Sequence, residues 1–300
     1  MNISEDTFVS WSQGPAATEA AKCENSETAV RRAIDADPNL AKMNITVFAQ
    51  GSYKARTNVR QDSDVDICVR YNEAFYDSYP NGKKREDFGN VAGNLKFSAF
   101  KPLVHAALQS YFGANAVTPG KKAFDVHANT YRIDADVIPA FAYRRYTGKV
   151  NQDGTHHYIP GIAFFPDQGQ MIINWPDQTY DNGVARNDAT GRHYKRVIRI
   201  FKRLRNKMQE DDIAEAENIA SFLIECLAWN SPLSAFQHET FTEDVRDVII
   251  SVWNATKTEE TCSKWVEVNQ LRWLFLQTQT WTREQAHKFM HAAWNYIGYK

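Results

Sequence analysis

The sequence predicts an α+β protein, with a mixed β-sheet and flanking helices in its first part and a helical lobe in its second. Two observations support this. Short apolar segments in the first part read as strands, and those near residues 63–70 and 130–138 alternate between polar and apolar side chains. From residue 191 onward, apolar residues instead recur at spacings of three and four, which is typical of helices with one buried face.

Composition limits the classes of protein. A chain of 300 residues that is 43% hydrophobic and 13% aromatic can form one large domain or two lobes. Its net charge of −1 gives no overall electrostatic case for binding long nucleic acid. The four cysteines are far apart, which favours neither a zinc module nor a disulfide framework. With no long apolar run and no secretory leader, we expect a cytoplasmic protein that does not interact with membranes.

In the first half of the chain, expected helices and strands alternate. A helix over 5–36 should end before Pro38, and a loop rich in Asn, Gly, Asp and Lys should cover 72–93. The other expected elements are strands at 44–49, 63–70, 122–128 and 130–138, a helix at 95–111, and β-segments at 157–165 and 170–174. Because Pro139 cannot donate to a sheet ladder, the strand should end there or lie at an edge.

The second half is expected to be helical after a polar loop over 175–191. Thr190 would cap a helix over 191–208. Lys195, Arg199 and Lys202 lie beside the apolar stripe of this helix; most such basic side chains are solvated, but a stripe facing a cleft would neutralise triphosphates. Further helices are expected from residue 213, broken at Pro232, and over 241–256 and 263–298. We expect two domains, 1–175 and 176–300.

One stretch carries the candidate chemistry. Asp64 and Asp66 share a face of the strand over 63–70, and two carboxylates so close repel each other unless a cation lies between them. Mg²⁺, held by a few carboxylates and by substrate phosphates, fits this pattern. Upstream, Gly51 and Ser52 end an apolar strand, where backbone N–H groups and a hydroxyl can hold a phosphate. Asp-x-Asp alone is common in solvated turns, but the combination favours phosphoryl transfer.

A second acidic strand offers a further carboxylate. Asp134 and Asp136 share a face of the strand over 130–138, with Arg132 on the same side. If Arg132 neutralises Asp134, Asp136 remains to complete a site of three carboxylates. Asp134 stays open as the alternative third ligand.

These residues resemble a known family. Gly51-Ser52, Asp64-x-Asp66 and the segment 136–141 (Asp-Val-Ile-Pro-Ala-Phe) resemble the polymerase β-like nucleotidyltransferases, in the group of 2′-5′-oligoadenylate synthetase and cyclic GMP–AMP synthase. The segments 197–202 and 221–225 resemble that group's triphosphate-contacting helix and nucleotide-pocket helix. Nearly the whole chain is similar to the bacterial members, the cGAS/DncV-like nucleotidyltransferases of the CdnE-like clade.

The resemblance implies a two-lobed enzyme with its active site in the cleft. The catalytic carboxylates would be Asp64, Asp66 and Asp136, holding two Mg²⁺ ions for which Mn²⁺ can substitute. The resemblance assigns the nucleotide to Gln50, Gly51, Ser52, Asn174, Lys202 and Ser221.

The implied reaction joins NTPs into a cyclic dinucleotide with release of pyrophosphate. The resemblance implies that this product is the second messenger of an anti-phage system (CBASS) and activates a downstream effector. Substrates would be ATP, and UTP if Asn174 reads a pyrimidine edge; Asn174 can equally be a strand-end residue that caps the following loop. Two other functions stay open: a transferase that adds nucleotides to RNA or to a small molecule, and an inactive nucleotide sensor.

Overall fold

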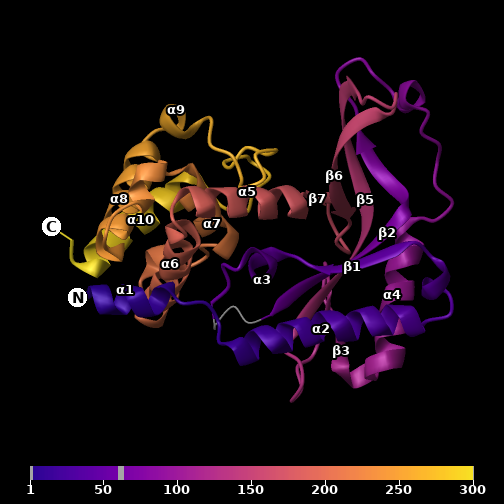
Figure 1. Cartoon of the computed structure of the whole chain (residues 1–300), viewed down its shortest axis with the longest axis horizontal. Helices are drawn as coiled ribbons and strands as arrows, with labels where there is room; N and C mark the ends of the chain where they lie inside the picture. Colours follow the sequence, from indigo (N-terminus) through magenta and orange to yellow (C-terminus); the bar gives the residue numbers. More distant parts are fainter. Residues whose placement is uncertain (1–2, 60–63, 300) are drawn as a thin grey trace. The chain divides into compact units, whose positions relative to one another are not determined.

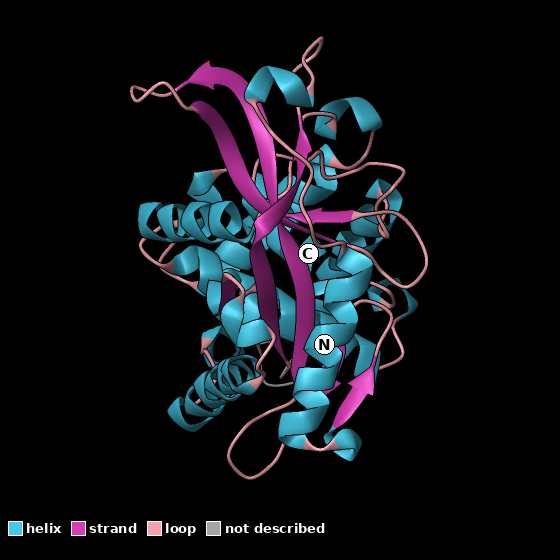
Figure 2. Cartoon of the chain, turned by 90° about the vertical axis from the view of Figure 1, so that its right-hand side faces the viewer, coloured by secondary structure: helices cyan, strands magenta, loops and turns pink. Residues whose placement is uncertain are grey.

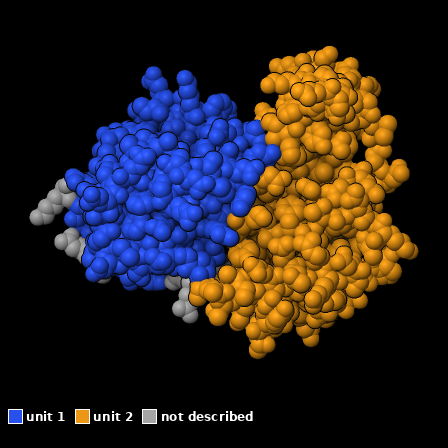
Figure 3. Space-filling view, in the orientation of Figure 1, with its two compact units in different colours: residues 1–15, 55–62, 178–300 blue, residues 16–54, 63–177 orange. Residues whose placement is uncertain are grey.

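The computed structural model describes residues 3–59 and 64–299. The chain divides into two compact units (Figure 3). The sheet unit comprises Ala16–Lys54 and Ser63–Asp177, and the helical unit comprises Met1–Pro15, Ala55–Asp62 and Gln178–Lys300. The main division falls near the expected boundary at 175/176, but two earlier segments group with the helical unit. Residue 63, with which the expected strand over 63–70 begins, lies outside the described residues.

The described strands of the sheet unit form one mixed sheet (Figures 1 and 2). They are β1 (Ile45–Ala49), β2 (Val65–Ser78), β3 (Val117–Pro119), β4 (Phe124–Val126), β5 (Ala135–Val150), β6 (His156–Phe164) and β7 (Ile172–Asn174). Their order is β1-β2-β5-β4-β3, and β6 pairs with β5 and β7. β2 and β5 are parallel, whereas the other pairs are antiparallel. The α+β class with a mixed sheet is therefore confirmed.

Two long helices, α2 (Ala17–Ala36) and α4 (Phe97–Phe112), cover this sheet, and the short α3 (Gly51–Ala55) follows β1. Side chains of α2 and α4 share one core with Val65, Ile67 and Val69 of β2. These three alternate residues are fully buried, as the period of two predicts. Since Asp66 lies between them in sequence, its side chain points to the opposite face of the sheet.

Two strands run further than expected. β2 continues to Ser78, so the first part of the expected loop over 72–93 is wrong. Tyr76 stacks on Phe141 of β5, with ring centroids 5.8 Å apart, which explains why this polar segment stays in the sheet. The expected strands at 122–128 and 130–138 are wrong at their ends, since β4 covers only Phe124–Val126 and β5 begins at Ala135 and reaches Val150.

The strand was expected to end, or lie at an edge, at Pro139, but β5 passes through this residue. The pairing register of β5 explains why a proline is tolerated at this position. β4 pairs with β5 only as far as Val137, and β6 pairs with it from Phe141 onward. Among the described strands, β5 therefore has no partner at Pro139 on that side, a position where a proline is tolerated.

The helical unit is built around α6 (His193–Glu210). Its apolar stripe of Tyr194, Val197, Ile198, Phe201 and Leu204 is buried, as the spacing predicts. The other helices are α1 (Glu5–Ser12), α5 (Pro176–Ala189), α7 (Ser221–Asn230), α8 (Phe241–Ala255), α9 (Glu259–Cys262) and α10 (Arg283–Ile297). Short 3₁₀ turns in the two units cover Leu40–Lys42, Arg85–Phe88, Ala114–Ala116, Ala214–Ala216 and Leu233–Phe236.

Three expectations about helices are wrong. The expected helix over 5–36 is interrupted between α1 and α2, because Pro15 disfavours helical backbone at Gly14. The expected loop over 175–191 is mostly α5, which begins with Pro176 at a position where proline fits a helix. The expected helix over 263–298 forms only from Arg283 onward.

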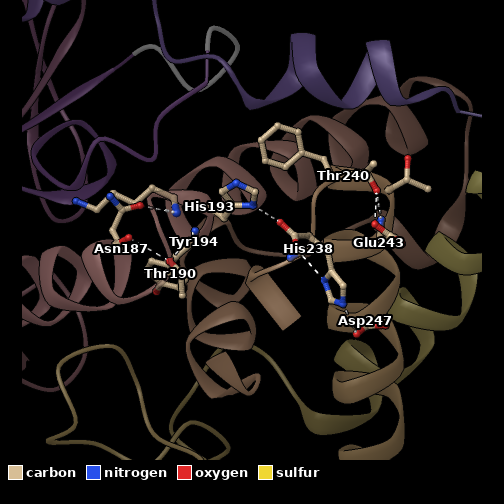
Figure 4. Close-up of polar contacts among 12 residues, drawn as sticks. Asn187, Thr190, His193, Tyr194, His238, Thr240, Glu243 and Asp247 are labelled. Carbon is tan, nitrogen blue, oxygen red and sulfur yellow. Dashed lines mark hydrogen bonds and ion pairs between the residues drawn. The ribbon is translucent and has the colours of Figure 1, made fainter. Parts of the chain in front are cut away.

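Polar contacts fix the start of α6 and of α8 (Figure 4). The Thr190 hydroxyl accepts the N–H of Tyr194 in the first turn of α6 at 3.2 Å, but the N-cap residue of this helix is Arg192, so the expectation that Thr190 is the N-cap is wrong. The buried carboxylate of Asp244 on α8 contacts Nδ1 of His193 at 2.6 Å and Nδ1 of His238 at 3.0 Å. These contacts tie α6 to α8 and to the segment before α8.

Within 3–59 and 64–299, none of the helices combines the length and the apolar character needed to span a bilayer.

Candidate active site

The central pair of the site comes from two neighbouring strands of the sheet unit. Asp66 of β2 and Asp136 of β5 are register partners in the parallel ladder. Residues directly paired across a ladder point to the same face, so the two carboxylates are neighbours there. Asp64 is exposed and lies two residues before Asp66, at the start of β2. The face that Asp64 and Asp66 are predicted to share on β2 therefore continues onto β5 with Asp136, the third predicted carboxylate.

The electrostatics of this face are unfavourable to negative charge. Burial raises the pKa of the Asp136 carboxyl, and the nearby carboxylates of Asp64 and Asp125 raise it further. Three acidic groups thus interact on this face of the sheet. A site of this kind gains from binding positive charge, which is the property that a divalent cation site needs.

Asp125 was missed by the sequence reasoning. It lies on β4, directly opposite Asp136 in the antiparallel ladder. Its carboxylate is 3.7 Å from Nε2 of His127, which also contacts the Thr118 hydroxyl at 2.9 Å. The available signal was the single acidic residue between two buried ones, Phe124 and Val126, but nothing local in the sequence shows which strand β4 pairs with.

Gly51 brings the backbone against Asp66. Its φ of +65° is left-handed, and a Cβ added here would lie 2.0 Å from Oδ2 of Asp66. Next to it, the N–H of Gln50 donates to the main-chain carbonyl of Asp66 at 2.8 Å. Only glycine fits this position, because any side chain would displace the carboxylate. The predicted Gln50-Gly51-Ser52 segment and the acidic pair therefore form one local structure.

Asp134 has a different role from Asp136. One of its carboxylate oxygens accepts the N–H of Ala128 at 2.7 Å, and its carbonyl accepts the N–H of Val65 at 3.1 Å. Asp134 thus links the loop before β5 to the start of β2 through hydrogen bonds. This geometry favours Asp136 over Asp134 as the third site carboxylate.

The oxygen donors fit a hard cation in character. No group of three or more His, Cys, Asp and Glu side chains is gathered closely enough to hold a metal by itself within the described ranges 3–59 and 64–299. Mg²⁺, however, binds through one or two carboxylates and completes its shell with water and substrate phosphates. The paired Asp66 and Asp136, with Asp64 beside them, match that requirement.

Asn174 ends β7 and is exposed, opposite Ile162 of β6. The next residue, Trp175, is buried and its ring meets that of Tyr143 edge to face, with centroids 6.2 Å apart. A Cβ at Gly161 would lie 2.8 Å from the carbonyl oxygen of Asn174, so the two strands approach closely here. The main chain at Asn174 is therefore held firmly, while its contact with a base stays a prediction.

The remaining predicted residues belong to the helical unit. Lys202 is fully buried, and its Nζ lies 2.9 Å from the Glu225 carboxylate. The position that the sequence suggested for it, beside the apolar stripe rather than in the core, is therefore wrong. Ser221 begins α7, and its hydroxyl accepts from Arg205 at 3.2 Å. The nucleotide contacts of Lys202 and Ser221 stay predictions.

Arg199 and Lys195, the other basic residues of that stripe, are also largely withdrawn from solvent. Arg199 donates to the main-chain carbonyls of Ser12 and Arg56, each at 2.7 Å, and burial lowers its pKa to about 10. Lys195 is 8% exposed. The expectation that most basic side chains of this helix are solvated fails for these three residues.

Comparisons with known proteins agree with this arrangement. Residues 181–298 match the family description "cGAS/DncV-like nucleotidyltransferase C-terminal helical domain". The chain is 40% identical to the cyclic dipyrimidine nucleotide synthase CdnE of Cecembia lonarensis, over 98% of both chains. It is 34% identical to the cyclic dipurine nucleotide synthase of Elizabethkingia meningoseptica, over the full length of both.

Among solved structures, the CdnE c-UMP-AMP synthase of Rhodothermus marinus, determined with Apcpp and Upnpp, has a TM-score of 0.84 and 32% identity. The match covers 99% of this chain and 98% of that one. With relatives at this identity over nearly the whole length of both chains, the chain belongs to the cGAS/DncV-like nucleotidyltransferases, in the CdnE group.

Proposed function

We propose that this chain is a cyclic dinucleotide synthase that joins two NTPs with release of pyrophosphate. The observation that carries the proposal is the register of Asp66 with Asp136. Beside this pair, position 51 can accommodate only glycine, because a side chain there would clash with the Asp66 carboxylate. The names of the relatives, which describe cyclic nucleotide synthases, support the same reaction. In the family this reaction belongs to anti-phage (CBASS) signalling, so we propose that role and a cytoplasmic location, where NTPs are available.

Asp64, Asp66 and Asp136 would hold the divalent cations, which we propose to be two Mg²⁺ ions replaceable by Mn²⁺. When bound, such ions stabilise the attacking and leaving oxygens of an in-line displacement. Asp136 would accept the proton of the acceptor hydroxyl as the general base. The hydroxyl oxygen then bonds to the α-phosphorus of the donor, and the bond to the departing pyrophosphate breaks.

The Gln50-Gly51-Ser52 segment would hold the donor triphosphate close to Asp66. Gly51 keeps this backbone next to the carboxylate, and the Ser52 hydroxyl can donate to a phosphate oxygen. Ser221 would contribute from the helical unit. A second round of the same displacement closes the linear intermediate into a ring, and the cyclic product would activate a separate effector protein.

We propose that uridine is among the incorporated nucleosides, through Asn174. Uracil presents an N3–H donor beside carbonyl acceptors, and a carboxamide can pair with one donor and one acceptor together. The relative that is 40% identical is named a dipyrimidine synthase, and the one that is 34% identical a dipurine synthase. Replacement of Asn174 by serine should shift the product toward purines without ending catalysis, since the carboxylates are unchanged.

One experiment tests the reaction and its alternatives. The purified chain is incubated with all four NTPs and Mg²⁺ or Mn²⁺ without any acceptor, and products are identified by mass, with Asp66→Asn as the control. A cyclic dinucleotide from wild type alone supports the proposal. Extension only of added RNA or of a small molecule would indicate the transferase alternative, and nucleotide binding without pyrophosphate release would indicate a sensor.

A further inference from the structure

We infer that a cavity between α8 and α10 in the helical unit binds a small aromatic carboxylate. The cavity has a volume of about 330 Å³, and each of the two helices contributes four of the residues that line it. The residues proposed for catalysis and for nucleotide binding do not belong to this lining. The inference therefore goes beyond the proposed function and does not rest on it.

The two helices line the cavity with the same pattern of side chains. On α8, Ile249 is followed four residues later by Trp253, and on α10 Met290 is followed four residues later by Trp294. Residues four apart lie on one face of a helix, one turn from each other. Ile249 and Met290 are each 1% exposed and form the buried part of the lining. Aliphatic and thioether groups beside two indoles make a suitable surface for an aromatic ring.

The size of the cavity favours a small molecule as its occupant. Ligand pockets range from about 300 to 1,000 Å³, so this one is at the small end and suits one or two fused rings rather than a whole NTP. Of the residues that line it, Ile250 is the exposed large apolar side chain, at 38%. A stable protein interface needs about 800 Å² on each partner, which a single exposed isoleucine does not supply.

Several polar groups of the lining are available to a ligand. Within residues 3–59 and 64–299, no acceptor forms a hydrogen bond with the indole N–H of Trp253 or of Trp294. The side-chain amides of Asn254 and Asn295, which are exposed residues of the lining, likewise have no partner in the part of the chain that the structure describes. These four groups all include N–H donors, so they match a ligand with acceptor oxygens.

A cation lies against each of the two indoles. The Nζ of Lys257 is 3.8 Å from the centre of the Trp253 ring, and the guanidinium carbon of Arg246 is 5.9 Å from that of Trp294. Among the described residues, 3–59 and 64–299, no carboxylate forms an ion pair with either cation. The lining itself contains no acidic residue. An anionic group on the ligand would therefore be attracted to the cavity, and a carboxylate supplies one such group.

The surroundings of His287 show the same excess of positive charge. Its ring stacks on that of Trp253, with centroids 5.4 Å apart. Burial lowers the pKa of His287, and the charges of Arg283, His291 and Lys257 lower it further, against the raising effect of its hydrogen bond to the Trp253 carbonyl. The wall of the cavity around Trp253 is thus electropositive.

The test uses three probes that separate the ring from the charge. Calorimetry measures the binding of 2-naphthoate, of its neutral amide 2-naphthamide, and of acetate to the full chain. We expect 2-naphthoate to bind about tenfold more tightly than 2-naphthamide, the usual size of one charge-assisted contact, and acetate not to bind measurably. Saturation with Mg²⁺ and the uncleavable α,β-methylene analogue of ATP should leave the affinity for 2-naphthoate unchanged.

Variants assign the binding to this cavity. Lys257→Met should weaken binding of 2-naphthoate about fivefold without changing that of 2-naphthamide, whereas Lys264→Met, at another exposed lysine, should change neither. Asn295→Trp and Asn254→Trp each place a large side chain in the cavity and should weaken binding of both ring probes at least about tenfold. Because both asparagines are exposed, the melting temperatures of these variants should stay close to that of wild type.

Equal affinity for 2-naphthoate and 2-naphthamide would overturn the inference, because the cations would then select nothing. Wild-type affinity in folded Asn295→Trp and Asn254→Trp, or displacement of 2-naphthoate by the ATP analogue, would overturn it by placing the probe elsewhere. Failure of both ring probes to bind, together with self-association of the chain that Ile250→Asp abolishes, would overturn it in favour of a contact between two copies.

Discussion

The carboxylate of Asp66 limits which residue can stand at position 51. A Cβ on Gly51 would lie 2.0 Å from Oδ2 of Asp66, and the φ of +65° adds strain for any L side chain. Gly89 has the same φ of +65° but nothing within 4 Å of its would-be Cβ. Comparing these two glycines separates the steric clash at the site from backbone strain alone.

We therefore expect Gly51→Ala to abolish product formation, because the carboxylate must move. Gly89→Ala should lower the free energy of unfolding by about 1 kcal/mol through strain and leave product formation intact. Mass analysis of products and urea unfolding of both variants measure these effects. Normal turnover by Gly51→Ala would show that the position of Asp66 does not matter for the reaction.

Asp136 gives a second prediction at this scale. Its raised folded-state pKa means that the folded chain binds a proton more readily than the unfolded chain, so the ionised group destabilises the fold above that pKa. Without metal, Asp136→Asn should raise the melting temperature at pH 7.5. The gain should shrink as the pH falls through that raised pKa toward the ordinary aspartate value of 3.8, and it should vanish below 3.8, where both states are protonated.

The same variant should form no product, whereas Asp134→Asn should retain most of the activity and gain no stability, since Asp134 accepts a hydrogen bond from Ala128. Melting curves with and without Mg²⁺, and product assays, give both readouts. If Asp134→Asn were the inactive one, the third site carboxylate would be Asp134.

The alternation of polar and apolar residues could place Asp64, Asp66 and Asp136 on the polar faces of their strands, because alternation is a local property. It could not bring Asp125 to Asp136, since strand pairing depends on contacts distant in sequence. For the same reason it could not show that Lys202 is buried: its partner Glu225 lies on another helix. Local patterns thus predicted which residues share a face of one strand or helix. They could not predict which of these faces pack against each other.

At the scale of elements, boundaries were predicted where composition changes sharply and missed where long-range packing decides. α4, α6 and α8 were expected within about two residues of their ends. The sequence of α5 is polar throughout, so its periodicity is too weak to distinguish a helix from a loop. The continuation of β2 depends on stacking of Tyr76 on Phe141, which only the folded sheet provides.

The start of α8 allows a prediction about an element. Asp244 is fully buried, and its carboxylate contacts His193 and His238 as well as the N–H of His238. Asp244→Ala leaves these donors without their acceptor, and we expect a loss of about 3 kcal/mol in the free energy of unfolding. Asp247→Ala, which removes only the partly exposed contact to His238, should cost less than about 1 kcal/mol. Urea unfolding would contradict this network if both variants lost the same stability.

At the scale of the whole molecule, the chain enters the helical unit first and returns to it twice. α1 belongs to that unit because Phe8 is fully buried in its core and Arg199 and Arg203 donate to the carbonyls of Ser12 and Ser10. Glu5 accepts from the N–H groups of Phe241 and Thr242 at the start of α8. The expected single domain boundary could not show this. Amphipathic spacing indicates that one face of α1 is buried, but it does not indicate which residues α1 packs against.

The two units have separate hydrophobic cores, which leads to a prediction about how stability is distributed. Phe8 lies in the core of the helical unit and Leu40 in that of the sheet unit, each at most 1% exposed. Phe8→Ala and Leu40→Ala should each remove about 3–4 kcal/mol, through lost burial and the cavity left behind. Because local unfolding follows cooperative units, each loss should appear mainly in the unit that contains the substitution.

Hydrogen exchange measured by mass spectrometry can test this directly. Phe8→Ala should speed exchange in α6 and α8 while β2 and β5 keep their protection, and Leu40→Ala should do the reverse. Val9→Ala is the control, since Val9 neighbours Phe8 but is 43% exposed and should change exchange little. If either core substitution sped exchange equally in both units, the molecule would unfold as one cooperative body. A sheet unit that keeps its protection in Phe8→Ala would instead show that the strands bearing Asp66 and Asp136 do not depend on the helical core for their stability.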